Sequence, residues 1–233
     1  MEPLRLVRIT STDQFPALAE QAAQTWIGSP IFDMLCPEHR SSPSRFRQVW
    51  RLILKNELAT PGAVILAALP PRSSSDDTKN AVGFAVWHRT GSSLTSQSWH
   101  QNSIHKKLLR LRVFLEIAYL MLTRWLSLAG FLAVQSAFEK VEKQHYPPER
   151  WRLSWLSVAP ASQRRGVGRG LLRWGVERGE EEGVAVVLEA SEMGRGLYTR
   201  AGFEVVGWEC FEGRWEGVRQ PVMIRAPGGG KIE

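Results

Sequence analysis

A glycine-rich stretch in the second half of the chain has the residue types of an anion-binding turn. It reads SVAPASQRRGVGRGLL over residues 157–172, with an apolar start, three arginines and three glycines before a helical run. The first N–H groups of a helix lack a partner within it, and the helix dipole adds about half a positive charge there. Gly166 and Gly168 let backbone approach a ligand, and Arg164 and Arg165 add charge. These features are typical of a phosphate-binding turn.

Two common nucleotide-binding turns fit this stretch poorly. A P-loop needs Gly-Lys-Ser/Thr for the phosphates and Mg²⁺, and no such triplet follows. A dinucleotide-binding turn expects an acidic residue about 20 positions on, a distance that Glu189 nearly satisfies. That turn opens a doubly wound fold, whereas this stretch follows several antiparallel-looking strands. On the glycines alone, a tight turn that binds nothing stays open as an alternative.

Hydrophobic periodicity predicts the elements that position the turn. We expect strands over residues 4–9, 63–69, 81–89, 151–158 and 184–190, with two more before the C-terminus. We expect helices over residues 12–27, about 44–58 and 166–182, and a short helix in GRGLYTRAG. Residues 90–103 are interpreted as a polar connector. Glycines in the helix at 166–182 favour close packing of that helix on the sheet.

Composition limits the class of protein. The chain has 233 residues, a formal net charge of +7 and two cysteines, Cys36 and Cys210. The charge is compatible with an anionic ligand, but the basic residues are not interleaved with aromatics, so we expect no nucleic-acid partner. Two distant cysteines indicate neither a disulfide framework nor a metal site. The start of the chain lacks the apolar core of a secretory signal, and we expect an intracellular, cytoplasmic protein.

Two blocks in the C-terminal half resemble the acyl-CoA-binding signature of the GNAT superfamily of N-acyltransferases. The first block is Val-x-Pro followed by Gln-x-x-Gly-x-Gly, here Val158, Pro160, Gln163, Gly166 and Gly168. The second, LEASEMGRGLYTRAGFEVVG, resembles the superfamily's strand followed by Leu-Tyr-x-x-x-Gly-Phe. Together the blocks cover roughly residues 150–207. The lead-in to the first block and the helical segment before it look most like fungal members of the superfamily.

The resemblance implies a fold and a domain organisation. The fold is α+β, with a central, largely antiparallel twisted sheet, splayed central strands and helices on both faces. We expect one domain over residues 1–226, with a helical insertion at about 104–145 and a flexible tail at 227–233.

The resemblance also implies residues that bind an acyl-CoA cosubstrate, with acetyl-CoA the expected form. The backbone N–H groups that hold the pyrophosphate belong to Arg164, Arg165, Gly166, Val167, Gly168 and Arg169. Gln163 braces the turn, and Arg164, Arg165 or Arg195 reaches the 3′-phosphate. Peptide groups of Leu156 and Val158 pair with pantetheine and the acyl carbonyl. Ser191 stands where many relatives carry asparagine, so its pantetheine contact is shorter or absent.

The implied reaction is direct transfer of the acyl group to a primary amine of a small molecule in a ternary complex, without a metal. Tyr198 matches the superfamily's tyrosine, which protonates the departing thiolate as a general acid. A protein or peptide acceptor, and an acyl-CoA-binding domain without catalysis, stay open as alternatives. No single general base is indicated, and neither is an oligomeric state. Element placement leaves five candidates for the base, namely His88, Glu116, Glu139, His145 and Glu189.

The segment 104–145 has two interpretations. Its first half shows one narrow polar stripe, which predicts a helix that buries most of its circumference. Glu116 and Arg124 lie inside the apolar run and argue against a membrane-spanning helix. We favour a helical lid over the acceptor end of the slot between the splayed strands. The alternative is a membrane-interface helix, because basic residues cluster at its head, namely His105, Lys106, Lys107, Arg110 and Arg112.

Overall fold

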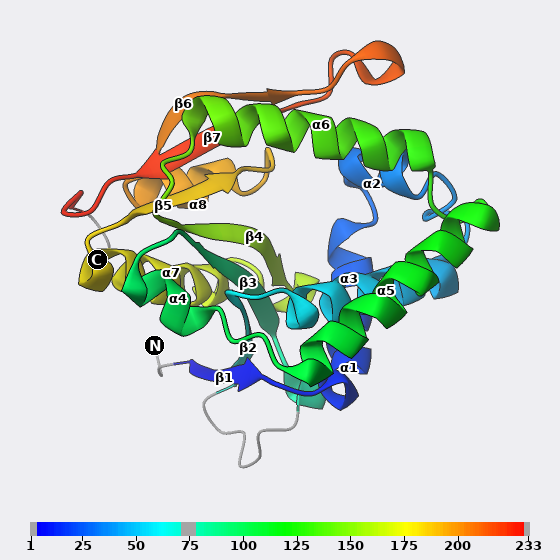
Figure 1. Ribbon diagram of the computed structural model, residues 1–233, viewed down its shortest axis with the longest axis horizontal. Coiled ribbons are helices and arrows are strands. Elements are labelled where there is room, and N and C mark those ends of the chain that lie inside the picture. Colours follow the sequence, from blue (N-terminus) through cyan, green and yellow to red (C-terminus); the bar gives the residue numbers. More distant parts are fainter. Residues whose placement is uncertain (1–3, 71–77, 231–233) are drawn as a thin grey trace.

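One sheet of seven strands organises the chain (Figure 1). The computed structural model describes residues 4–70 and 78–230, so the last three residues of the predicted tail lie outside the described part. The strands are β1 (Arg5–Ile9), β2 (Ala63–Leu69), β3 (Gly83–Thr90), β4 (Arg150–Val158), β5 (Ala185–Glu189), β6 (Glu204–Cys210) and β7 (Arg219–Arg225). Their order is β1-β2-β3-β4-β5-β7-β6, and only β4 and β5 pair in parallel. The predicted α+β fold with a largely antiparallel sheet is confirmed.

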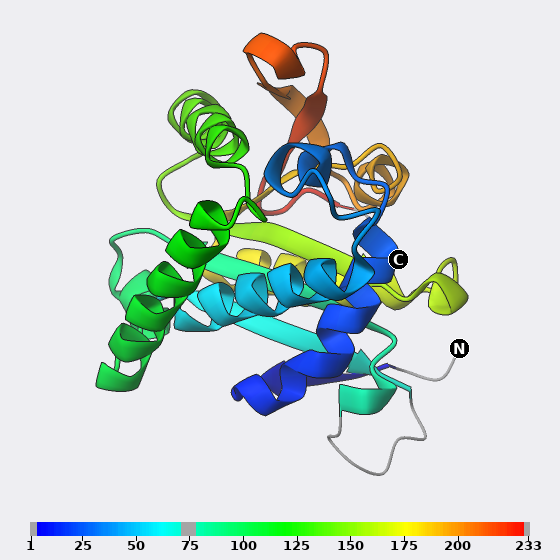
Figure 2. The ribbon, with the colours of Figure 1, turned by 90° about the vertical axis from the view of Figure 1, so that its right-hand side faces the viewer.

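Helices lie on both faces of this sheet (Figures 1 and 2). The face that carries the glycine-rich turn packs against α7 (Val167–Glu182), α8 (Arg195–Arg200) and the short α4 (Leu94–Trp99). The opposite face packs against α1 (Phe15–Trp26), α3 (Pro43–Ala59) and α6 (Leu128–His145). The short α2 (Pro30–Leu35) contacts α6, and α5 (Ile104–Leu122) packs on the outside of α3.

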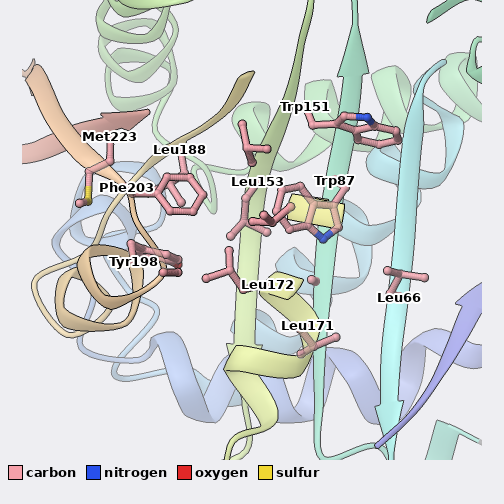
Figure 3. Close-up of a cluster of buried hydrophobic side chains, with 14 of the residues drawn as sticks. Leu66, Trp87, Trp151, Leu153, Leu171, Leu172, Leu188, Tyr198, Phe203 and Met223 are labelled. Carbon is pink, nitrogen blue, oxygen red and sulfur yellow. The ribbon is translucent and has the colours of Figure 1, made fainter. Parts of the chain in front are cut away.

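Two apolar layers separate these helices from the sheet. Under α7, the fully buried rings of Trp87 and Trp151 lie among leucines of β4, β5 and α7 (Figure 3). Across the sheet, Phe32, Trp50 and Phe84 form an aromatic layer beneath α1 and α3. Both layers cover the sheet close to β4, which is therefore held rigidly from above and below.

Glycines bring α7 close to the sheet, as the sequence predicts. A Cβ built at Gly175 would lie 2.3 Å from the ring of Trp87, and one at Gly179 would lie 2.5 Å from the side chain of Val186. An interior helix glycine costs about 0.5–1 kcal/mol relative to alanine. Here the cost is offset because the helix packs directly against large buried side chains.

Residues 90–103 differ from the predicted polar connector because they include a helix. The Ser93 side chain caps α4, and Glu149 accepts hydrogen bonds from the backbone N–H groups of Ser92 and Ser93 at 2.6 and 2.8 Å. Hydrogen bonds, first of all those from Ser93, lower the pKa of Glu149 to about 2. Glu149 lies more than 50 residues from this helix in the sequence, so local periodicity does not reveal the contact.

The predicted burial of the first helix in segment 104–145 is wrong. α5 buries only Leu109, Val113 and Leu120, on the side that faces α3, and its other side is exposed. The helix ends at Leu122, and Arg124 adopts a φ of 61° in the turn before α6. The expected polar stripe is therefore interrupted, because its last residues, Thr123 and Ser127, lie in the turn between α5 and α6. Among the described residues, no helix has the length and apolarity needed to cross a bilayer.

Replacing Gly175 with alanine tests the close packing of α7. The added methyl group would overlap the Trp87 ring, and such overpacking costs about 1–3 kcal/mol. We expect Gly175→Ala to lower the free energy of unfolding measured by urea titration. Gly170→Ala is the matched control on the same helix, because its new Cβ meets only the tip of the Leu4 side chain, at 3.0 Å. Equal effects of the two substitutions would contradict the packing argument.

Candidate functional site

The central feature of the site is the point at which β4 and β5 separate. The two strands pair over four residues each, from Arg150 opposite Ala185 to Leu153 opposite Leu188. Beyond Leu153, β4 continues to Val158 and pairs with β3 alone. Ser154 is an extra residue in that pairing, because Trp155 faces Val86 while Leu153 faces Trp87. This β-bulge bends the strand where the pairing with β5 ends, which opens a slot between β4 and β5.

Backbone groups of β4 point into this slot. The N–H of Ala159 bonds to the carbonyl of Val82, so residues 157 and 159 direct their peptide groups towards the β3 side. Peptide groups alternate along a strand, and those of Leu156 and Val158 therefore point towards the slot. The carbonyl of Val158 accepts hydrogen bonds from Gln163 Nε2 and Thr25 Oγ1, each at 3.2 Å. The peptide groups of Leu156 and the N–H of Val158 are left for a ligand.

The glycine-rich turn joins the end of β4 to the start of α7. Arg164 and Gly166 both adopt left-handed φ values, 59° and 79°, which turn the chain sharply before Val167. The hydrogen-bond ladder of α7 begins with Gly170 N–H bonded to the Gly166 carbonyl at 2.9 Å. Within residues 4–70 and 78–230, the N–H groups of Val167, Gly168 and Arg169 have no backbone acceptor. The turn therefore has the donors of an anion site, and Gln163 braces it through Val158.

Four exposed arginines surround this turn. Arg164, Arg165 and Arg169 belong to the turn and the first helical residues, and Arg195 begins α8. In the described part of the chain, none of the four forms an ion pair with an acidic side chain. The two helix starts lie close together, since a Cβ at Gly168 would be 3.4 Å from Leu197 of α8. Uncompensated positive charge thus gathers beside free N–H groups, a combination that favours phosphate.

Ser191 lies at the C-terminal end of β5, on the other side of the slot. Its hydroxyl accepts the Gly194 N–H at 3.1 Å, and its carbonyl accepts the Arg195 N–H at 3.0 Å. The side chain therefore shapes the turn into α8, and its hydroxyl keeps one proton to donate and one lone pair to accept.

Tyr198 is buried between α8 and α7 (Figure 3). Its ring lies against Phe203, with centroids 6.0 Å apart, and contacts the backbone position of Gly194, where a Cβ would come within 2.9 Å. Burial raises the pKa of Tyr198 above its ordinary value of 10.0, so the hydroxyl stays protonated at neutral pH. Among the described residues this hydroxyl has no hydrogen-bond partner, which leaves its proton available.

A group of ionisable side chains lies on the opposite face of the sheet, between α3 and α6, where β4 and β5 part. We call this group the polar cluster. Its members are Glu57, His88, Tyr146, Arg152, Glu189 and Glu209.

Ion pairs and hydrogen bonds join most members of the polar cluster. His88 Nε2 donates to Glu57 at 2.6 Å, and Arg152 donates to Glu189 through both Nε and an Nη, the latter at 2.9 Å. Tyr146 also donates to Glu189, at 2.6 Å. Burial disfavours the charge on Glu57, but attraction to His88 and the hydrogen bonds outweigh it and lower the pKa of Glu57. Glu57 is thus held as a charged, paired carboxylate, and Glu189 is paired with Arg152 and Tyr146.

Glu209 is the exception within this cluster. Only 4% of the residue is exposed, and in the described ranges its carboxyl forms neither a salt bridge nor a hydrogen bond. Burial and repulsion from Glu189, opposed by attraction to Arg152, raise the pKa of Glu209 from 4.5 to about 8. Glu209 pairs with Gln220 of β7, two residues beyond Val222, which faces Glu189. Glu209 therefore lies level with the C-terminal end of β5, beside the open part of the slot.

The structure separates the five candidate bases. His88 and Glu189 belong to the polar cluster, but both are engaged in short ion pairs. Glu116 bonds to Lys55 at 2.8 Å on the outside of α3, Glu139 is exposed, and His145 packs against Gly207. Sequence reasoning missed Glu209, Glu57 and Arg152. Glu57 and Glu209 lie more than 150 residues apart, and local spacing holds no signal that both belong to one cluster around Arg152.

Across residues 4–70 and 78–230, no three of His, Cys, Asp and Glu gather in an arrangement suited to a metal ion.

Comparisons with known proteins connect this geometry to a family. Residues 125–205, which include the first signature block and all but the last two residues of the second, match a family model described as an acetyltransferase (GNAT) domain. Over 52 residues the chain is 40% identical to "Probable acyltransferase SID5" of Ajellomyces capsulatus. That match covers 22% of this chain and 38% of the relative, so the chain matches little more than a third of the relative's length.

Solved structures show the same fold. A Corynebacterium glutamicum structure, described as histone acetyltransferase HPA2 and related acetyltransferase, is 18% identical and gives a TM-score of 0.61 over 99% of both chains. A structure from Desulfovibrio desulfuricans, assigned to the GNAT family, is 15% identical with a TM-score of 0.51 over 96% of this chain and 98% of that one. At these identities the similarity establishes the fold alone.

Glu57→Gln tests whether the ion pair with His88 supports the fold. Hydrogen bonds to charged groups contribute about 1.5–3 kcal/mol, and we expect the free energy of unfolding at neutral pH to fall by about that amount. Because the pKa of Glu57 is lowered in the folded state, this stabilisation should vanish as the pH falls below 4.5. Glu116→Gln is the control, since its exposed pair with Lys55 should contribute less than about 1 kcal/mol. A loss that persists in acid would contradict this account.

Proposed function

We propose that this chain carries a domain of the GNAT superfamily and that it transfers an acyl group, acetyl in particular, from acyl-CoA to a primary amine of a small molecule. The observation that carries the proposal is the slot between β4 and β5, with free backbone donors of α7 at one end and the polar cluster at the other. An extended acyl-CoA molecule fits such a slot, because its phosphates and its thioester carbon lie far apart.

Acyl-CoA is the expected cosubstrate on the chemistry of the donors. The N–H groups of Val167, Gly168 and Arg169 suit a pyrophosphate, and the exposed arginines beside them suit the 3′-phosphate. The peptide groups of Leu156 and the N–H of Val158 suit the amides of pantetheine, which would extend β4 as an added strand. Ser191 adds one hydroxyl donor on the far side of the slot.

The proposed reaction is direct attack of the amine nitrogen on the thioester carbonyl. The new C–N bond forms as the C–S bond breaks, and the thiolate takes the proton of the Tyr198 hydroxyl. Tyr198 suits this role because burial keeps it protonated and its hydroxyl lacks another partner in the described chain. The amine must lose a proton before or during attack, and Glu209 is the unpaired carboxyl at that end of the slot. A pKa near 8 lets Glu209 accept a proton close to neutral pH.

A small cationic acceptor fits the polar cluster better than a peptide does. The side chains of Glu57, Glu189 and Glu209 face one arginine and one histidine, and a cationic amine bound there would favour the charged form of Glu209. α6 covers this face of the sheet, since Phe138 lies over the Arg152 guanidinium at 4.2 Å and Tyr146 bonds to Glu189. We propose that α6 acts as the lid of the acceptor pocket, within one domain formed by residues 1–226.

Both cysteines are free thiols, in keeping with the proposed cytoplasmic location.

Calorimetric titration with acetyl-CoA tests the cosubstrate. We expect binding by the wild type and loss of binding in Gly168→Glu, because a carboxylate would then lie among the donors meant for pyrophosphate. Arg173→Glu is the control, since it brings a carboxylate to an exposed position five residues further along α7 and also removes a positive charge. Removing the 3′-phosphate from the ligand should weaken binding less than Gly168→Glu does. Wild type that fails to bind, or equal binding by both variants, would refute the proposed cosubstrate.

The pH dependence of turnover tests the proposed base and acid. We expect kcat to increase with pH along a titration curve whose midpoint lies near 8. Glu209→Gln should lower kcat about 100-fold and remove this increase. Tyr198→Phe should lower kcat by a similar factor, keep the rise and leave acetyl-CoA affinity unchanged. The free-energy cost of burying a charged Glu209 grows as the pH rises from 4.5 to about 8. Above pH 8, Glu209→Gln should therefore have a higher free energy of unfolding than the wild type. An unaltered pH profile in Glu209→Gln would assign the proton transfer to another group.

A further inference from the structure

One face of α5 is apolar along its whole length and points away from the molecule. Its residues recur every three or four positions, and each is more than half exposed: Ile104, Leu108, Leu111, Leu115, Tyr119 and Leu122. We call them the outer stripe of α5. The opposite side of the helix packs on α3 through Leu109 and Val113, so the outer stripe is not needed for the core. α5 runs along the outer edge of the structure in both views (Figures 1 and 2).

The apolar surface continues past the end of α5. Leu128, Phe131 and Leu132, in the first turns of α6, are exposed as well, just after the corner that joins the two helices. Single exposed leucines are common on folded proteins, but soluble monomers rarely expose a contiguous apolar patch of more than a few hundred Å². Aligned apolar residues over five turns of helix therefore indicate a binding surface.

The charges that border the outer stripe are all positive. Lys107 lies one turn from Leu111, and Arg112 lies one turn from both Leu108 and Leu115. Both basic side chains are exposed. Glu116 is the single acidic residue between positions 104 and 138 of the sequence, and its charge is paired with that of Lys55 of α3.

We propose that the outer stripe of α5 seats this protein on a bilayer surface that contains anionic lipid. The helix lies in the plane of the interface, with its leucines at the boundary of the acyl chains and Lys107 and Arg112 at the headgroups. A second copy of the chain fits this face less well, because a two-fold contact would bring the same basic residues together. Attachment is peripheral, in keeping with the lack of a spanning helix among the described residues.

This inference stands apart from the proposed acyl transfer. It uses no residue of the slot, the glycine-rich turn or the polar cluster, and neither the cosubstrate nor the acceptor enters its test. The position of α5 still relates this surface to the proposed site, since α5 leads directly into α6, the helix that covers the polar cluster. A protein seated on α5 would hold the lid of its proposed acceptor pocket next to the lipid surface.

Vesicle sedimentation of the full chain tests the proposal. We expect the wild type to pellet with vesicles of equal parts phosphatidylcholine and phosphatidylserine, and far less with phosphatidylcholine alone. Lys107→Glu combined with Arg112→Glu should weaken binding at least about 30-fold, since each basic residue near an anionic surface contributes roughly fivefold. Leu111→Ser combined with Leu115→Ser should weaken it by at least about 100-fold. These side chains are exposed, so circular dichroism and the thermal midpoint should stay unchanged.

Matched controls distinguish vesicle binding through this surface from nonspecific effects of charge and hydrophobicity elsewhere on the protein. Lys143→Glu combined with Arg173→Glu makes the same change of charge elsewhere, and Leu94→Ser removes an exposed leucine that is 85% accessible on α4. Both controls should bind vesicles as the wild type does. Equal loss in the controls, equal binding by the α5 variants, or pelleting that does not depend on phosphatidylserine would overturn the proposal. So would a dimer, seen by light scattering, that Leu111→Ser with Leu115→Ser abolishes while vesicle binding persists.

Discussion

The separation of β4 from β5 is the constraint on which the rest of the site depends. Peptide groups along the unpaired edge of a buried strand are costly unless something bonds to them, so this part of the sheet needs a ligand or water in place of a neighbouring strand. The bulge at Ser154 sets where that edge begins. The same geometry brings the start of α7 to one end of the opening and the carboxylates of the opposite face to the other.

Buried charge holds the acceptor side of the slot in shape. Arg152 lies in a paired row of β4, Glu189 directly follows the last paired residue of β5, and the two side chains bridge the strands at the point where these part. Such a pair adds little net stability over an apolar alternative, but removal of either partner leaves an isolated buried charge, which is strongly unfavourable. The pair therefore restricts the conformations of the strands more than it strengthens the fold. Phe138 and Tyr146 extend the same restriction to α6.

Sequence patterns predicted the parts of this structure that depend on local order. The runs at residues 63–69 and 166–182 correspond closely to β2 and α7, and the glycines at 175 and 179 indicated the close approach of that helix. Contacts between distant residues gave no such signal. Glu149 anchors α4, and Glu209 meets Glu189 and Arg152 only because β6 lies beyond β7 in the sheet. The burial of α5 was predicted wrongly because the sequence of an apolar helix does not indicate whether protein or another medium covers its apolar side chains.

The carbonyl of Val158 accepts hydrogen bonds from both Gln163, within the turn, and Thr25, on α1. A glycine-rich surface loop ordinarily samples many conformations. A ligand that binds only one of them has a lower affinity, because ordering the loop costs conformational entropy. Here that loss is incurred when the chain folds, since two side chains already tie the turn to the end of a rigid strand. The turn is preorganised, and α1, which lies far from it in the sequence, belongs to its support.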